Sequence, residues 1–139
     1  MSEFVEVKTA ELKGVALDWA VAHATKAWTW AHEWYPTMTL DPTFRGVSDN
    51  APGGRVRLVP NNPMRQDSQP FNPSTDWAQG GRLIEKHVTA LNQSGTESWW
   101  AHAEDRLGLG SAPLIAACRA IVAANIGATA SIPKELCND

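Results

Sequence analysis

The chain has 139 residues and a net charge of −3, and 43% of its residues are hydrophobic. This length corresponds to one domain, which can bury a core without disulfides or a structural metal. Its pI of about 5.8 argues against charge-driven binding of nucleic acid, which typically needs a pI above about 9 or a basic stripe. Residues 1–8 lack the basic and apolar regions of a signal peptide, and no apolar run reaches about 18 residues, so we expect a cytoplasmic protein without membrane contact.

The N-terminal region predicts a short strand followed by a helix. The strand is expected at residues 4–8, and Thr9 is placed to cap the helix. Apolar and aromatic residues then recur at helical spacing. The helix must end before Pro36, because proline cannot continue it.

The composition changes between residues 36 and 74, which hold seven of the nine prolines. Only residues 55–59 resemble a strand there. A connection of this length in a compact domain is usually either functional or disordered, and the sequence leaves both interpretations open. We therefore predict a single domain over residues 1–139 that carries a long loop or insertion at about 36–74.

Regular structure resumes after this loop. Residues 77–87 predict a short helix that runs into a strand reaching Leu91, and a second strand is expected at 98–103. The strongest prediction is a helix at 113–126, whose residues are apolar on nearly every side and which should therefore be central and buried. A last strand at 128–132 completes an α+β fold, in which this helix is flanked by the N-terminal helix and a small, mostly antiparallel sheet.

Three sequence blocks occur in an order found in a known family. They are residues 7–12 with 14–22, residues 73–81 and residues 113–119, and the middle block contains the unusual run Ser-Thr-Asp-Trp-Ala-Gln-Gly-Gly. Together these blocks resemble the NinX-like proteins of tailed phages and prophages. The resemblance implies a phage or prophage accessory protein that acts inside the bacterial host cell, and it implies no activity. The stretch at about 28–71 departs from the shorter members of the family.

The segment at residues 74–81 is the strongest candidate site. It brings together two hydroxyls, a carboxylate, an indole and an amide, followed by two glycines that allow close approach of another chain or a ligand. It could bind a host or phage protein or a small molecule, without catalysis. Alternatively, its polar residues cap a helix and tie down the long loop, while its tryptophan fills the core. The residues assigned to binding are Ser74, Thr75, Asp76, Trp77, Gln79, Gly80, Gly81, Glu85, Arg119 and Asp18.

An enzyme is the alternative function. It would act on a small polar metabolite, with Asp76, Glu85 or Asp18 as the general base. An enzyme should bring at least two of these carboxylates into one concave pocket with a polar partner, whereas a binding protein can leave them on a flat surface.

Metal and phosphate motifs are incomplete. His32 and Glu33 begin like a helical zinc motif, but Pro36 stands where the second histidine is required. The other histidines and the two cysteines lack ligand spacing, so we predict no metal and no cofactor. The run Gly-Leu-Gly-Ser at 108–111 could hold an anion at the start of the next helix, although we favour turn glycines followed by a serine cap.

Tryptophan is unusually frequent, with seven residues. Trp28, Trp30 and Trp34 cluster with Tyr35 near the end of the first helix. Core packing or a homo-oligomer interface explains such a cluster, and binding of a partner protein is an alternative. Base stacking is not favoured, because stacking platforms usually have a basic groove and only Lys26 lies close by.

Arg119 is the only charged residue of the predicted central helix, so its guanidinium must reach water or a carboxylate. The candidate partners are Asp18, Asp76 and Glu85. We expect Asp76, since a bidentate pair would hold residues 74–81 against the helix. The alternative is that the side chain extends along its aliphatic stem to solvent.

The two cysteines are expected to stay reduced and unpaired. Cys118 lies in the predicted central helix and should be buried as a small apolar residue. Cys137 lies near the C-terminus and should belong to a mobile tail.

Overall fold

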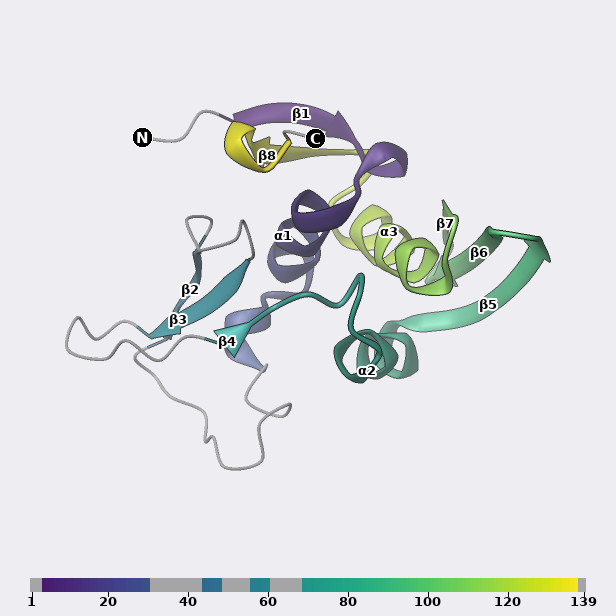
Figure 1. The fold of residues 1–139 in the computed structure, drawn as a ribbon, viewed down its shortest axis with the longest axis horizontal. Coiled ribbons are helices and arrows are strands. Elements are labelled where there is room, and N and C mark those ends of the chain that lie inside the picture. Colours follow the sequence, from purple (N-terminus) through teal and green to yellow (C-terminus); the bar gives the residue numbers. More distant parts are fainter. Residues whose placement is uncertain (1–3, 31–43, 49–55, 61–68, 138–139) are drawn as a thin grey trace.

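The computed structural model describes residues 4–30, 44–48, 56–60 and 69–137. Helices and strands are mixed along this part of the chain, as in an α+β fold (Figure 1). In chain order they are β1 (Phe4–Lys8), η1 (Thr9–Glu11), α1 (Gly14–Thr25), η2 (Ala27–Thr29), β2 (Phe44–Ser48), β3 (Arg57–Pro60), β4 (Gln69–Pro70), α2 (Trp77–His87), β5 (Val88–Gly95), β6 (Ser98–Ala103), β7 (Arg106–Gly110), α3 (Pro113–Asn125), β8 (Thr129–Pro133) and η5 (Lys134–Cys137).

Antiparallel sheets are arranged around α1 and α3 (Figure 1). β1 pairs with β8, so that Phe4 lies opposite Pro133 and Lys8 opposite Thr129. A second sheet has the order β2-β3-β4, and a third has the order β5-β6-β7. The predicted α+β class is confirmed, although the described strands belong to three small sheets and not to one.

α3 is the centre of the core, as its sequence predicts. It packs against α1, α2 and the third sheet. Its many alanines let these neighbours approach on several sides, and each fully buried Leu, Ile or Val side chain contributes about 1.5–3 kcal/mol. The buried residues of α3 are Leu114, Ala116, Ala117, Cys118, Ala120, Ile121 and Val122.

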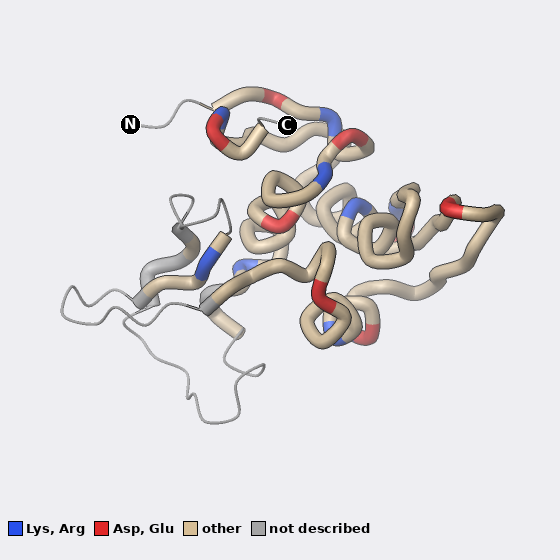
Figure 2. The backbone as a smooth tube through the Cα atoms, viewed as in Figure 1, with Lys and Arg blue, Asp and Glu red and all other residues tan. Residues whose placement is uncertain are grey.

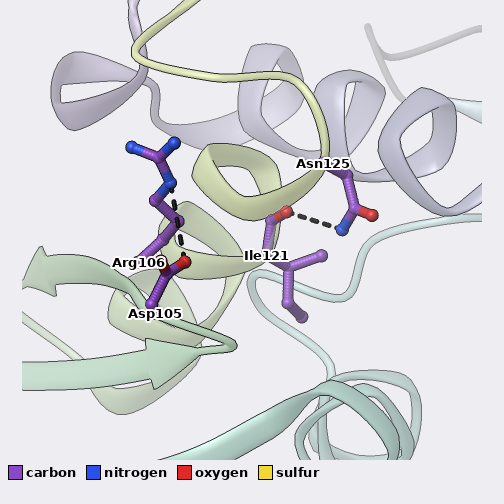
Figure 3. A network of polar contacts seen from close by, with 4 residues as sticks. All are labelled: Asp105, Arg106, Ile121 and Asn125. Atoms are coloured by element: carbon purple, nitrogen blue, oxygen red, sulfur yellow. Dashed lines mark hydrogen bonds and ion pairs between the residues drawn. The ribbon is translucent and has the colours of Figure 1, made fainter.

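Local signals set both ends of α3. Pro113 occupies the first turn, where its missing N–H has no helical acceptor. At the other end, the Asn125 side chain donates from Nδ2 to the Ile121 carbonyl at 2.9 Å (Figure 3), and the Ile126 and Gly127 amides both donate to the Val122 carbonyl. Gly127 follows with a φ of +125°, a conformation that favours glycine.

The first helix begins later than the sequence predicts. Thr9 does not cap it, because residues 9–11 form the short 3-10 turn η1 and the Thr9 hydroxyl donates to the Gly127 carbonyl at 2.6 Å. The backbone then turns at Gly14, whose φ of +59° is favourable only for glycine and a few polar residues. α1 therefore runs from Gly14 to Thr25, and Lys26 ends it in the left-handed conformation.

The strand β7 was not predicted. Residues 108–110 belong to it, so neither the anion-binding loop nor the turn is correct, and the N-cap of α3 is Ala112 and not a serine. A side chain at Gly108 would collide with the Ala116 carbonyl and the Ala120 amide of α3, and one at Gly110 would meet the Ala116 amide. These glycines let a strand lie directly on a helix backbone. The alternation Leu-Gly-Leu-Gly was the signal that could have revealed the strand.

Acidic and basic residues are interspersed along the described chain (Figure 2). Asp105 and Arg106 form an ion pair of 3.9 Å at the turn between β6 and β7 (Figure 3). Both side chains are exposed, so such a pair contributes at most about 1 kcal/mol. Among the described residues, no helix combines the length and the apolar character needed to cross a membrane.

Candidate binding site

Asp18 connects α1 to the segment at residues 71–76, which passes over it on the way to α2. Its side chain is buried, and Oδ1 accepts a hydrogen bond of 2.9 Å from the Ser74 amide, 56 residues away in sequence. Burial raises the pKa of Asp18 from 3.8 to about 7, and the amide and hydroxyl of Ser74 partly oppose this shift. The hydroxyl is also buried and has no hydrogen-bond partner of good geometry among the described residues. Asp18 and Ser74 thus fasten the segment to the core.

Gln79 fastens the same segment from the other side. Its side chain is buried, and Oε1 accepts from the Asn72 amide at 2.8 Å while Nε2 donates to the Pro70 carbonyl at 3.1 Å. The Phe71 amide donates to the Val56 carbonyl at 2.9 Å, which joins the segment to the second sheet. Gln79 therefore ties down the end of the long connection, in agreement with the alternative interpretation of this residue.

Asp76 and Gly80 also have structural roles. Asp76 caps α2, because its Oδ1 accepts from the Ala78 amide at 2.9 Å. At Gly80 a side chain would meet the Pro73 carbonyl at 2.6 Å and would collide with Leu114 of α3. Gly81 is different, since no atom lies within 4 Å of the position that a side chain would take.

Trp77 does not fill the core, so that part of the alternative interpretation is wrong. It is 57% exposed at the first turn of α2, although most neighbouring residues of the segment are used in hydrogen bonds or close packing. Gly81 and Glu85 follow at helical spacing of four residues, and Arg82 lies beside them. We call this surface, made of Trp77, Ala78, Gly81, Arg82 and Glu85, the α2 face.

Arg119 does not pair with Asp76, so the predicted ion pair is wrong. Its Nε donates to the Leu12 carbonyl at 2.8 Å, and Nη1 donates to the Leu109 carbonyl at 2.7 Å. The two residues do not meet because the Arg119 side chain points in a different direction. Cys118, one residue earlier, faces Asp18 and interacts with it electrostatically, and successive residues of a helix point about 100° apart. Arg119 consequently faces η1 and β7. Partial burial lowers the pKa of its guanidinium.

The cysteines are free thiols, as predicted. Cys118 is fully buried, and burial together with the charge of Asp18 raises its pKa well above the ordinary value. The prediction for Cys137 is wrong, because the residue lies half-buried in η5. Its Sγ donates to the Pro133 carbonyl at 3.6 Å, in the last 3-10 turn of the described chain.

Trp30 is packed against its own chain. Its indole N–H donates to the Thr25 carbonyl at 2.7 Å, and its ring meets the edge of Phe71 at 6.5 Å. Lys86 Nζ lies 5.4 Å from the ring centre. Trp34, like Tyr35, His32 and Glu33, lies outside the described residues, and so does the side chain of Trp28. A homo-oligomer interface at this cluster therefore stays a prediction.

The carboxylates considered for catalysis do not share a described cavity. A cavity of about 530 Å³ lies between β1, η1, the start of α1 and η5, and another of about 380 Å³ lies between β7 and η1. Asp18, Asp76 and Glu85 line neither of them. Within the described ranges, moreover, no three His, Cys, Asp or Glu side chains gather in a metal-binding arrangement.

The Asp18–Ser74 contact joins two of the sequence blocks that resemble NinX-like proteins, and the third block begins α3. A comparison with protein families agrees with this resemblance, because the family described as bacteriophage P22 NinX matches residues 8–125. The chain belongs to this NinX family. It is therefore a phage accessory protein, and the long connection lies within the matched region. A search of curated proteins found no match.

Proposed function

We propose that this NinX protein is a non-enzymatic accessory protein that binds a partner protein of the phage or its host through the α2 face, with Trp77 at the centre. One observation carries the proposal. Trp77 is 57% exposed at the start of α2, whereas most other residues of the segment at 71–81 are held by hydrogen bonds or close packing. Tryptophan is among the residues most enriched at the energetic centres of protein interfaces. A rigid support adds to its value, because little freedom is lost when the partner binds.

The surroundings of Trp77 fit a flat protein surface better than a pocket for a small molecule. Ala78, Arg82 and Glu85 are exposed beside it, and neither described cavity includes a residue of α2. Gly81 leaves open space on this face, into which a side chain of the partner can fit. The mixture of an aromatic centre with charged neighbours is typical of interfaces between proteins that also exist separately.

The enzymatic alternative is favoured by one observation only, the pKa of about 7 at Asp18, which suits a general base. Its geometry argues against that role. Asp18 Oδ1 accepts a hydrogen bond from the Ser74 amide, and the carboxyl group is buried. Asp18 lines neither described cavity, so neither cavity gives a substrate access to it. Asp76 is used as a helix cap, and Glu85 is exposed on α2.

The proposal can be tested by photo-crosslinking in infected host cells. A photoreactive amino acid is placed at the exposed Ala78, and the same amino acid at the exposed Thr96, in the β5–β6 turn, is the matched control. Irradiation should join one defined protein to position 78 and not to position 96, and mass spectrometry identifies it. Introduction of Trp77→Ala into the position-78 protein should reduce the product at least about tenfold.

Two results would contradict the proposal. One is the absence of a protein specific to position 78 in cells that contain the folded protein. The other is a product that is unchanged by Trp77→Ala, because the tryptophan would then not be the centre of the interface.

A further inference from the structure

β7 is an edge strand with unpaired backbone groups. Among the described strands only β6 pairs with it, with Ala101 opposite Gly108 and His102 opposite Leu107. The Leu109 carbonyl accepts from Arg119 and therefore points away from β6. Because backbone groups alternate in direction along an antiparallel strand, the Leu107 amide and carbonyl and the Leu109 amide point to the same free edge. An edge of this kind can pair with another extended chain.

A groove runs along this free edge. It has a volume of about 380 Å³, within the range of about 300–1,000 Å³ found for ligand pockets. β7 forms one wall, and Thr9 and Ala10 of η1 form part of the opposite wall. Leu107 and Leu109, 52% and 56% exposed, add apolar surface beside the edge. The groove thus offers both backbone partners and apolar contacts to an extended segment.

Arg119 lines the groove and has no carboxylate partner in the described chain, since Asp105, which also lines it, pairs with Arg106. The side chain lines the groove, and its Nε and Nη1 are held by carbonyls of Leu12 and Leu109. Nη2 makes no hydrogen bond among the described residues and can donate two. The two carbonyls hold the guanidinium in position, so a carboxylate that enters the groove finds a preorganised partner.

We infer that the β7 groove binds an extended peptide segment of a partner protein, which adds a strand to the third sheet and places a carboxylate on Arg119. The added strand pairs with the free backbone groups of β7, and the carboxylate accepts hydrogen bonds from the N–H groups of Arg119 that have no partner among the described residues. This surface shares no residue with the α2 face, so the inference is independent of the proposed function. A second copy of this chain is the competing occupant. A second copy matches the charge of Arg119 less well than an acidic peptide does. Its β7 edge has Arg106 next to Asp105, so it brings as many basic as acidic side chains to Arg119.

A selection from a displayed library of random peptides tests the inference with the complete chain. Recovered peptides should alternate β-branched or aromatic residues with polar ones and should share one Asp, Glu or free C-terminus. The best peptide is then made in two forms, with Glu or with Gln at the shared acidic position. The Gln form should bind the unmodified protein at least about tenfold more weakly, because a charge-assisted hydrogen bond is lost.

Two variants at one position separate backbone pairing from side-chain contact. Leu107→Pro removes the free edge N–H without removing a bond to β6, whereas Leu107→Ala keeps that N–H and removes only the exposed side chain. We expect Leu107→Pro to weaken peptide binding at least about tenfold and Leu107→Ala to weaken it less than about fivefold. Circular dichroism should show both variants folded.

Four results would overturn the inference. A selection that recovers no peptide contradicts it, as does equal binding of the Glu and Gln peptides. Equal effects of Leu107→Pro and Leu107→Ala would mean that the edge N–H is not used. A concentration-dependent dimer in sedimentation experiments that Leu107→Pro abolishes would assign the edge to a second copy of the chain instead.

Discussion

The segment at residues 71–81 and the strand β7 differ in which of their groups are available for binding. The sequence of the first suggests a site, but several of its amide and carboxyl groups are used to hold the chain, and Trp77 is the large hydrophobic side chain left exposed. The second has the composition of a turn, yet it offers a free strand edge beside Arg119.

Glycine has the same role in both regions. Gly80 and Gly108 each lie against α3 so closely that a side chain would collide with it or with the adjacent chain. At these two positions glycine therefore indicates close packing and not a flexible or ligand-binding loop, whereas Gly81 faces open space. Binding residues are therefore expected among polar and aromatic groups that make no hydrogen bond within the chain and do not pack in the core.

The largest expected effect on the free energy of unfolding comes from Asp18, which is buried and holds the segment at residues 71–81 through Ser74. Its pKa is about 7 in the folded chain and 3.8 without the fold. The folded state thus binds the proton more tightly, and stability falls as pH rises from about 4 to about 7, then stays low. Asp18→Asn keeps an acceptor for the Ser74 amide and has no charge. It should raise the free energy of unfolding above pH 7 by up to about 4 kcal/mol, with little gain below pH 4.

Urea denaturation of both proteins across this pH range measures the difference. Since all other carboxyl groups are common to the two proteins, their contributions cancel in the comparison. A difference that does not grow with pH would mean that burial does not raise the pKa of Asp18.

A second prediction compares the glycines directly. Gly108→Ala forces β7 away from α3 and should lower the free energy of unfolding by about 1–3 kcal/mol or more. Gly81→Ala is the matched control, because it places the same methyl group in open space on α2. It should stabilise the protein by about 0.5–1 kcal/mol through its helix propensity. Equal effects of the two substitutions in thermal denaturation would contradict the close packing of β7.

A third prediction concerns Gln79, which should not contact the partner. Gln79→Ala leaves the Asn72 amide and the Pro70 carbonyl without their partners and should cost about 1–3 kcal/mol in chemical denaturation. Hydrogen exchange should then become faster at the Asn72 amide. If stability is unchanged while partner binding is lost, Gln79 belongs to the interface and not to the fold.

Periodicity and capping predicted β1, α2, β6 and α3 closely, whereas β2, β4 and β7 were not predicted. β1 and α2 have the predicted bounds, and α3 ends one residue before the predicted end, because their apolar spacing, Asp76 and Gly127 are local signals. β7 was not predicted because glycine is depleted in strands, so the run Leu-Gly-Leu-Gly indicated a turn more strongly than its alternation indicated a strand.

The site depends on contacts that local signals do not contain. Ser74 meets Asp18 across 56 residues of sequence, and no pattern within either block specifies that pair. α3 is apolar on most sides, so its sequence did not indicate which neighbour each side would meet, and the direction of Arg119 was predicted wrongly. The exposure of Trp77 likewise follows from the way α2 packs on α3.

The most direct test of the account measures binding and stability of Trp77→Ala together, with the crosslinked partner purified. Titration calorimetry should show a Kd at least about tenfold higher than for the unmodified protein. Denaturation should show a loss of less than about 1 kcal/mol, because the side chain is mostly exposed. An unchanged Kd would contradict the central claim that Trp77 is reserved for a partner. A loss of several kcal/mol would contradict it as well, since the tryptophan would then support the fold.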